Sequence, residues 1–294
     1  MLILWLLLFV SLARSESVKT PVWAEVEPAE FEVTLGGEPV EVKSVQSPDD
    51  NLILLIVMDT VKHPDRVDVA RSAIVDKLKS LGPKYFAGVM TAQDGLVVEQ
   101  DPIRNRKRLL DKLNGLDVRG LPGLLDTVEQ ASRLADRTLS AADVRVAVLF
   151  ITDGEIEDYR GDYTIPVVNP SDRRDLSRRF RDQLILERVH TIVDGLEVAQ
   201  APLFFLHLAR QNDDLNEVYQ NGINEFAETT GGRALFAQSL QEIPLLVDRL
   251  LDRIAAHFVL TIDGAVDTPQ KLEVRVEGVE AEHRERVSLP PASS

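Results

Sequence analysis

The sequence predicts an α/β protein: a Rossmann-like, open and mostly parallel sheet with helices on both faces, accompanied by a small β-module. Two continuous apolar runs, 52–58 and 144–151, have the length and composition of strands that are covered on both sides. Segments with helical spacing alternate with strands between residues 52 and 256, as in doubly wound sheets. Before and after this stretch, strand patterns follow one another without helices. We therefore expect the two ends of the chain to form the β-module together.

The first segment has the pattern of a signal peptide. Its apolar run, residues 1–13, is shorter than the roughly 20 residues that a membrane-spanning helix needs. It ends in Ala13-Arg14-Ser15, which puts small residues at the −3 and −1 positions of a cleavage site. We expect a signal peptide over 1–15 and an exported protein, periplasmic or extracellular, without stable membrane insertion after cleavage. A buried N-terminal element and an uncleaved anchor are the alternatives.

The remaining chain divides into three parts and a tail. An N-terminal hairpin module is expected over 22–48, because apolar and polar residues alternate on both sides of Gly36-Gly37. The α/β domain is expected over 50–256, with strands at 52–58, 85–90, 96–98, 144–151, 202–208 and 234–236. Its helices are expected at 65–81, 104–113, 123–134, 173–193, 215–228 and 240–256. Strands within 257–289 are expected to pack on the N-terminal module, and 290–294 is expected to be a disordered tail.

Composition excludes several classes of function. The chain carries 33 Lys and Arg against 48 Asp and Glu, and its net charge of −15 disfavours binding to nucleic acid or anionic lipid. It has no cysteine, which excludes disulfides, Cys-ligated zinc, iron–sulfur clusters and thiol catalysis. It also lacks the nucleophile elbow, the zinc-protease helix, the P-loop and the dinucleotide fingerprint. We therefore expect a non-catalytic protein.

Two carboxylates follow the two most apolar strands. Asp59 ends the run 52–58, and Asp153 follows the run 144–151. Ligands of open α/β sheets bind at the carboxyl ends of the strands, where a carboxylate is a candidate anchor for a divalent cation. The alternative is that each Asp caps the helix or turn that follows it. His207, inside an apolar strand, is expected to be a hydrogen-bonded core residue.

A strand that ends in Asp, followed by a helix and later by a strand that ends in Thr152-Asp153-Gly154, resembles the von Willebrand factor type A (VWA) domain. The hairpin over 31–45 and the segments 226–234 and 258–262 resemble parts of a bacterial, largely acidobacterial, secreted branch of that family. The resemblance spans residues 31–289. It implies the VWA fold and a role in protein–protein binding.

The chain departs from the metal-ion-dependent adhesion site (MIDAS) of that family. The family motif is Asp-x-Ser-x-Ser after the first strand, a Thr from a Gly-Thr loop and an Asp after the later strand. By the resemblance, Asp59 and Asp153 match, Val61 and His63 stand at the serine positions, and Pro122 stands at the threonine position. Val and Pro offer no oxygen ligand. We therefore expect a degenerate MIDAS.

These positions are expected to form a partner-binding surface without a cofactor. Lys62 would add a positive charge beside them, which further disfavours Mg²⁺. The partner is expected to be a protein whose identity the sequence does not specify. The surface comprises the degenerate MIDAS positions Asp59, Thr60, Val61, His63, Pro122 and Asp153.

Three alternatives remain open at this point. The first is that the chain binds a metal ion. Asp59, His63 and Asp153 have the side chains of a zinc or other transition-metal site. A cation site would otherwise be completed by ligands from a partner, in an adhesion or chelatase-type module. Asp59 would otherwise act as a phosphoryl-accepting nucleophile in a hydrolase. The chain would otherwise be a structural scaffold of a secretion or cell-surface system.

An arginine-rich segment is a second candidate for docking. The segment 172–182 carries five arginines in an acidic chain, inside a long excursion after the strand at 144–151. It is either a docking surface for an acidic partner or a solvated helical face with Asp–Arg pairs. The arginines are Arg173, Arg174, Arg178, Arg179 and Arg181.

Overall fold

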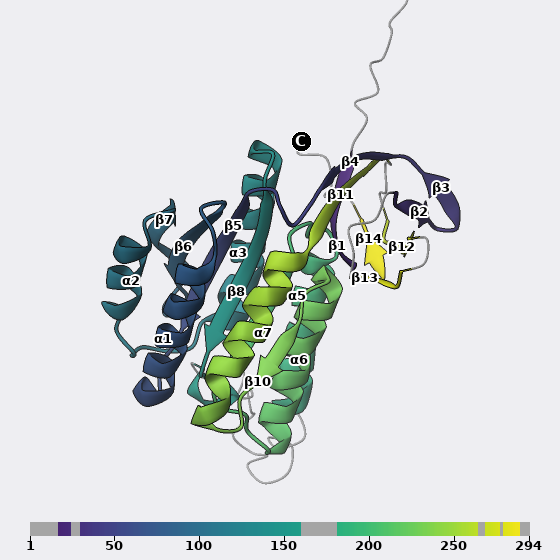
Figure 1. Ribbon diagram of the computed structural model, residues 1–294. Helices are drawn as coiled ribbons and strands as arrows, with labels where there is room; N and C mark the ends of the chain where they lie inside the picture. The colour runs from purple at the N-terminus through teal and green to yellow at the C-terminus, as the bar shows by residue number, and fades with distance from the viewer. Residues whose placement is uncertain (1–16, 25–29, 160–180, 264–267, 277–278, 289–294) are drawn as a thin grey trace, which may run out of the picture.

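A six-stranded sheet forms the centre of the computed structural model, which describes residues 17–24, 30–159, 181–263, 268–276 and 279–288 (Figure 1). In spatial order its strands are β10 (Ala234–Phe236), β9 (Leu203–His207), β8 (Arg145–Thr152), β5 (Leu52–Asp59), β6 (Tyr85–Thr91) and β7 (Val97–Ile103). All neighbours are parallel except β6 and β7. This confirms the expected open, mostly parallel α/β sheet.

Helices cover both faces of this sheet (Figure 1). One face carries α1 (Pro64–Ser80), α2 (Arg106–Asn114) and α7 (Ile243–Ala256). The other carries α3 (Leu124–Ala141), α5 (Arg181–Leu196) and α6 (Asp214–Thr230). Successive side chains of a strand point to opposite faces of the sheet, so the residues of β5 belong alternately to two hydrophobic cores. Ile56 packs in the core under α1, α2 and α7, and Val57 packs in the core under α3, α5 and α6. The continuous apolar run at 52–58 follows from this double covering.

Two small antiparallel sheets form the β-module. The first has the order β13 (Ala281–His283), β1 (Ser17–Ala24), β11 (Phe258–Asp263) and β4 (Val42–Gln46). The second has the order β14 (Arg286–Val287), β12 (Gln270–Arg275), β2 (Glu32–Leu35) and β3 (Glu38–Val40). Strands from both ends of the chain thus pair with one another, and they enclose a core of their own.

The module is fastened to the helix ends of the α/β domain. Lys19 donates to the carbonyl of Leu139 in the last turn of α3, at 2.8 Å. The indole of Trp23 donates to the carbonyl of Arg253 in α7, also at 2.8 Å. The buried Arg284 donates to two carbonyls just beyond α5. Helix C-termini leave carbonyls without partners and attract cations, so the module stabilises the end of the sheet that lies opposite Asp59.

Several elements differ from the expected ones. Strand β1 was not expected, and it contains Pro21, a residue that argues against a central strand. It is tolerated because β13 reaches only residues 22–24, so Pro21 pairs on one side alone. Strand β7 extends beyond the expected 96–98, since Pro102 is accepted on an outer edge. Helix α3 continues beyond 134 because Leu139 is buried.

The expected hairpin is divided between the two small sheets. Its turn is confirmed: Gly36 and Gly37 have φ angles of 58° and 92°, the conformation that a tight hairpin turn requires. Its second strand ends at Val40, however, and the residues of β4 pair with β11 instead. Segments 1–15, 160–180 and 290–294 lie outside the described residues. None of the helices in the described part of the chain combines the length and the apolarity that crossing a bilayer requires.

Candidate functional site

Asp59 and Asp153 lie side by side at the carboxyl ends of β5 and β8. Asp59 is paired with Thr152 in the sheet register, and the N–H of Asp153 donates to the carbonyl of Asp59 at 3.3 Å. Both side chains are fully buried. The two adjacent parallel strands therefore bring the two carboxylates together, as their positions after the apolar runs predicted.

Both oxygens of Asp59 accept hydrogen bonds inside the protein. The N–H of Gly123 donates to Oδ1 at 2.8 Å, and the hydroxyl of Thr152 donates to Oδ2 at 2.9 Å. The loop before α3 comes this close only because position 123 is glycine: a Cβ atom there would lie 1.9 Å from the carbonyl oxygen of Ala92. Burial raises the pKa of Asp59 to about 6.

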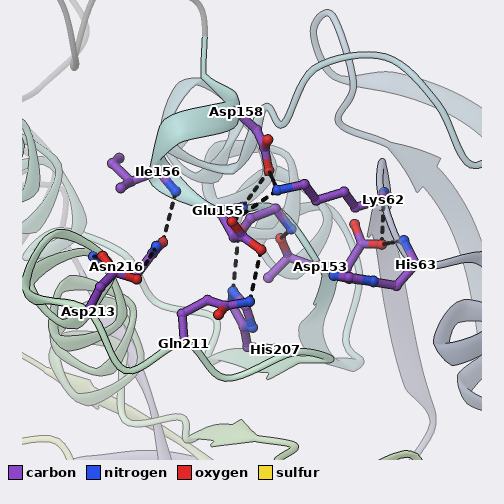
Figure 2. A network of polar contacts seen from close by, with 12 residues as sticks. Lys62, His63, Asp153, Glu155, Ile156, Asp158, His207, Gln211, Asp213 and Asn216 are labelled. Carbon is purple, nitrogen blue, oxygen red and sulfur yellow. Dashed lines mark hydrogen bonds and ion pairs between the residues drawn. The ribbon is translucent and has the colours of Figure 1, made fainter.

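Asp153 caps helix α1 from across the sheet. Its Oδ1 accepts the N–H of Val61 at 2.6 Å. Its Oδ2 accepts the N–H groups of Lys62 at 3.0 Å and His63 at 2.6 Å (Figure 2). His63 stands at the N-cap of α1, and its own side chain makes no capping hydrogen bond. A carboxylate is stabilised at this position because free N–H groups and the helix dipole converge there.

Lys62 connects the loop after β5 with the loop after β8. Its ammonium lies 2.9 Å from Glu155 and 3.0 Å from Asp158, and the side chain keeps 39% of its surface exposed. Although partial burial opposes it, hydrogen bonding to Glu155 and Asp158 raises the pKa of Lys62. Glu155 also accepts from the amide of Gln211 at 2.8 Å. Figure 2 shows Lys62 reaching toward both carboxylates.

Glu155 is the N-cap of the short 3₁₀ helix η1 (Ile156–Asp158), which contains Asp158 and is anchored to the residues beneath it. The N–H of Ile156 donates to the amide oxygen of Asn216 in α6 at 3.0 Å (Figure 2). The hydroxyls of Tyr159 and Tyr219 lie 3.1 Å apart in a buried contact. The surface that Lys62 joins is therefore fixed to both the sheet and α6.

His207 lies under the same surface as a buried, neutral residue. Its Nε2 lies 3.1 Å from the carbonyl of Gly154, and its Nδ1 accepts the N–H of Ala209 at 3.3 Å. The ring therefore carries its hydrogen on Nε2. Burial lowers the pKa of His207 to about 4. The expectation of a hydrogen-bonded core histidine is confirmed.

The structure brings the six expected surface positions together, but at different depths. Asp59, Thr60, Pro122 and Asp153 are buried beneath the surface. Val61 and His63 are half-buried and Lys62 is exposed. The exposed part of the site is thus the loop 61–63.

Two other features complete the account of the expected residues. Arg181 opens α5, whereas Arg173, Arg174, Arg178 and Arg179 lie outside the described residues. In the described ranges, no group of three or more His, Cys, Asp or Glu side chains is arranged to hold a metal ion.

Sequence reasoning missed the acids that hold Lys62. Glu155 and Asp158 follow Thr152-Asp153-Gly154 directly and therefore lie at the same strand end. Their position directly after this strand end was the signal by which sequence reasoning could have found them. The pairing itself joins residues more than 90 positions apart, and no local pattern indicates it.

Comparison with solved structures identifies the fold. A von Willebrand factor type A protein from Catenulispora acidiphila superposes with a TM-score of 0.50 at 8% identity, over 95% of this chain and 76% of that one. The PilB minor pilin from Streptococcus sanguinis is similar with a TM-score of 0.47 at 10% identity, over 73% of this chain and 63% of that one.

The proximal thread matrix protein 1 from the mussel byssus, in a structure with a zinc-occupied MIDAS motif, is similar with a TM-score of 0.47 at 9% identity, over 74% of this chain and 48% of that one. No protein-family model matches the sequence, and no curated protein matches it. At such low identity the match to the Catenulispora protein concerns the fold alone. The chain has the VWA-like fold, an α/β sheet with additional small antiparallel sheets.

Proposed function

We propose that the chain is an exported, non-catalytic protein-binding module whose partner face is the strand-tip surface around Val61, Lys62 and His63. Domains of the VWA fold commonly mediate protein interactions. The loop 61–63 is the exposed part of the site, and it is held in place by Asp153 from below and by Glu155 and Asp158 from the side. A surface fixed in this way loses little conformational freedom when a partner binds.

The hydrogen bonding of Asp153 carries the further proposal that this surface works without a resident metal ion. By the resemblance, Asp59 and Asp153 stand where the family holds its cation. Asp153 accepts three backbone N–H groups, Asp59 accepts two hydrogen bonds, and Val61 and Pro122 have no side-chain oxygen. Mg²⁺ requires a near-octahedral shell of oxygen ligands, so the residues present do not fit that ion.

Lys62 is held at this surface by two carboxylates. Its ammonium offsets one of the two negative charges of Glu155 and Asp158 and joins their loop to the loop after β5. A lysine held by two carboxylates stays charged throughout the neutral pH range, whereas the occupancy of a cation site depends on the concentration of the free cation. We infer that partner binding here does not depend on divalent ions.

Two further parts of the proposal concern residues that lie, except for Arg181, outside the described ranges. Export would use the signal peptide over 1–15. The arginines at 173–181 would add an attachment point for acidic side chains of the partner. Use of Asp59 as a nucleophile is disfavoured, because the carboxylate is fully buried and both of its oxygens are occupied.

Site-specific photocrosslinking in the cells that produce the protein would test the proposal. A photoreactive residue at position 61 or 63 is expected to capture a defined protein, equally with and without EDTA. The matched control is position 45, an exposed valine on β4 in the β-module, 43% exposed, which is expected not to capture it. Loss of the product in EDTA would contradict the metal-free proposal, and capture at position 45 alone would contradict the proposed face.

A further inference from the structure

Two stretches of chain connect the α/β domain with the β-module, and one buried arginine holds both. One stretch leads from β4 into β5, and the other leads from α7 into β11. Arg145, the first residue of β8, donates to the carbonyls of Pro48 and Asp50 on the first stretch, at 2.8 and 3.1 Å. It also donates to the carbonyls of Ala255 and His257 on the second, both at 2.8 Å. We call these two stretches, tied by Arg145, the junction.

His257 lies in the junction as a fully buried side chain. Its Nδ1 lies 2.6 Å from the carbonyl oxygen of Ile254, so the neutral ring donates from Nδ1 and carries its lone pair on Nε2. Within the described residues, Nε2 has no hydrogen-bond partner. The closed junction therefore provides no acceptor for the second N–H that protonation of the ring would create.

The surroundings of His257 also oppose its positive charge. Burial, reinforced by the guanidinium of Arg145, lowers the pKa of His257 from 6.5 to about 3. Arg145 is itself fully buried. The other titratable groups around the junction are exposed or engaged elsewhere: Asp49 with Lys84, Asp143 with Gln46, Arg253 with Glu282, Tyr85 with Arg145, and Asp50, which is exposed.

Trp23 of the β-module packs beside His257. The two rings lie 5.9 Å apart, and the indole lies 6.2 Å from the ring of Phe204 in β9. Trp23 thereby belongs to the core under α7, whereas the β-module has a separate core of its own. Opening of the junction would withdraw Trp23 from the first core and leave the second one intact.

Another contact limits how far the two parts can separate in acid. Lys19 and Arg284 of the β-module donate to carbonyls at the ends of α3 and α5. Asp136 lies near Arg284, and burial raises the pKa of this carboxyl to about 6. A proton taken up by Asp136 favours the packed state, so acid does not weaken this contact as it weakens the junction.

We propose that His257 makes the junction an acid-sensitive hinge: protonation of its ring opens the junction and frees Trp23, while the helices of the α/β domain and the contact around Arg284 stay in place. The closed junction keeps His257 neutral, whereas the open one lets it take up a proton. The ratio of open to closed molecules is therefore expected to rise up to about tenfold for each pH unit between 6.5 and about 3. The hinge lies at the end of the sheet opposite the loop 61–63, and its test is independent of the function proposed above.

Trp23 reports the opening, because it is the only tryptophan after residue 15. We would titrate the mature protein from pH 7 to pH 3 and measure how strongly acrylamide quenches its fluorescence. This ratio of intensities is preferable to the intensity itself, which a protonated imidazole nearby would lower without any opening. In a preparation that keeps residues 1–15, Trp5→Phe leaves the same single probe.

Far-ultraviolet circular dichroism of the same samples follows the α/β domain, which holds the helices of the described chain. A local opening costs less free energy than unfolding of the whole domain and is expected at a higher pH. The quenching constant is expected to rise at least about threefold before the helical signal falls by about a tenth. Coincident changes of the two signals, or protection of Trp23 until the helices are lost, would overturn the proposal.

Two histidine variants assign the opening to its residue. His257→Asn keeps an N–H donor near the position of Nδ1 and cannot be protonated, so it is expected to move the rise in quenching down by at least about one pH unit. His190→Asn replaces an exposed histidine of α5 and is expected to leave the curve unchanged. A folded His257→Asn protein that opens at the wild-type pH would also overturn the proposal. The comparison of the two signals in the wild-type protein needs no variant and stands where Asn at position 257 impairs folding.

Discussion

The carboxylate of Asp153 accepts the backbone N–H of His63 at 2.6 Å, although 90 positions separate the two residues. His63 precedes the first turn of α1, so the residue that follows β8 provides the cap that α1 lacks locally. The contact couples the two strand tips on which the proposed partner face is built. The contribution of this contact to the free energy of unfolding is the first quantity to measure.

Replacement of Asp153 by Ala is expected to destabilise the protein by about 2–4 kcal/mol, because three partly buried N–H groups lose their acceptor. Asp153→Asn retains one carbonyl oxygen and is expected to cost less. Urea denaturation monitored by circular dichroism would give both values. Asp194→Ala, on the exposed surface of α5, is the control and should stay within about 0.5 kcal/mol of wild type. Equal effects at positions 153 and 194 would contradict the capping role.

Asp59 is expected to shape the pH dependence of stability. Its folded pKa of about 6 lies above the ordinary value of 3.8, so the folded state binds the proton more tightly than the unfolded state. This contribution to stability is full below pH 3.8 and is lost as the pH rises through about 6.

The buried histidines act with the opposite sign. The folded pKa of His207 is about 4 and that of His257 about 3, both below 6.5, so their contribution is lost as the pH falls below 6.5. The substitution Asp59→Asn removes the contribution of Asp59 to the pH dependence of stability and leaves the contributions of the two histidines. Between pH 4 and 6 its stability is expected to rise with pH more steeply than that of wild type, by up to about 1.4 kcal/mol per pH unit. Urea midpoints at pH 4, 5, 6 and 7 would test this, and parallel curves would contradict it.

Calorimetric titration with Mg²⁺, Mn²⁺ and Zn²⁺ is expected to detect no site tighter than about 1 mM, because the carboxylate oxygens at the strand tips already accept hydrogen bonds. The control is the double variant Asp59→Asn and Asp153→Asn. Binding at about 10 μM or tighter that disappears in the double variant would contradict the metal-free surface. Such a result would return His63 to consideration as a ligand.

Glycine at position 123 is expected to be irreplaceable. Gly123→Ala would place a Cβ atom 1.9 Å from the carbonyl oxygen of Ala92, and the loop would have to move away from Asp59. We expect a loss of at least about 3 kcal/mol or failure to fold. Gly82→Ala is the matched control, because a Cβ there meets no atom within 4 Å. Thermal unfolding of the two variants should therefore separate widely, and similar melting temperatures would refute the close approach.

The α/β domain was largely predictable because burial leaves a direct trace in the sequence. Strands covered on both sides, such as β5 and β8, need uninterrupted apolar residues, and Gly231 ends α6 in the left-handed conformation that glycine favours. These signals are local. They also sufficed to bring Asp59 and Asp153 to one edge of the sheet.

The rest depended on contacts between distant segments. Strand β1 contains a proline and is a strand only because β11 and β13 lie beside it. The pairing of Lys62 with Glu155 and Asp158, and the capping of α1 by Asp153, depend on how two loops meet. A single sequence records the residue types in these contacts but not their pairing.

The placement of β4 beside β11 has a mechanical consequence. The chain enters the α/β domain after β4 and leaves it into β11, and these two strands are antiparallel neighbours. The described chain begins in β1 and ends one residue after β14, so both of its ends lie at the two small sheets. Tension applied between those ends would therefore pass through the small sheets and bypass the α/β domain. A partner held at the loop 61–63 would be carried on a body that stays unstrained until β4 and β11 separate.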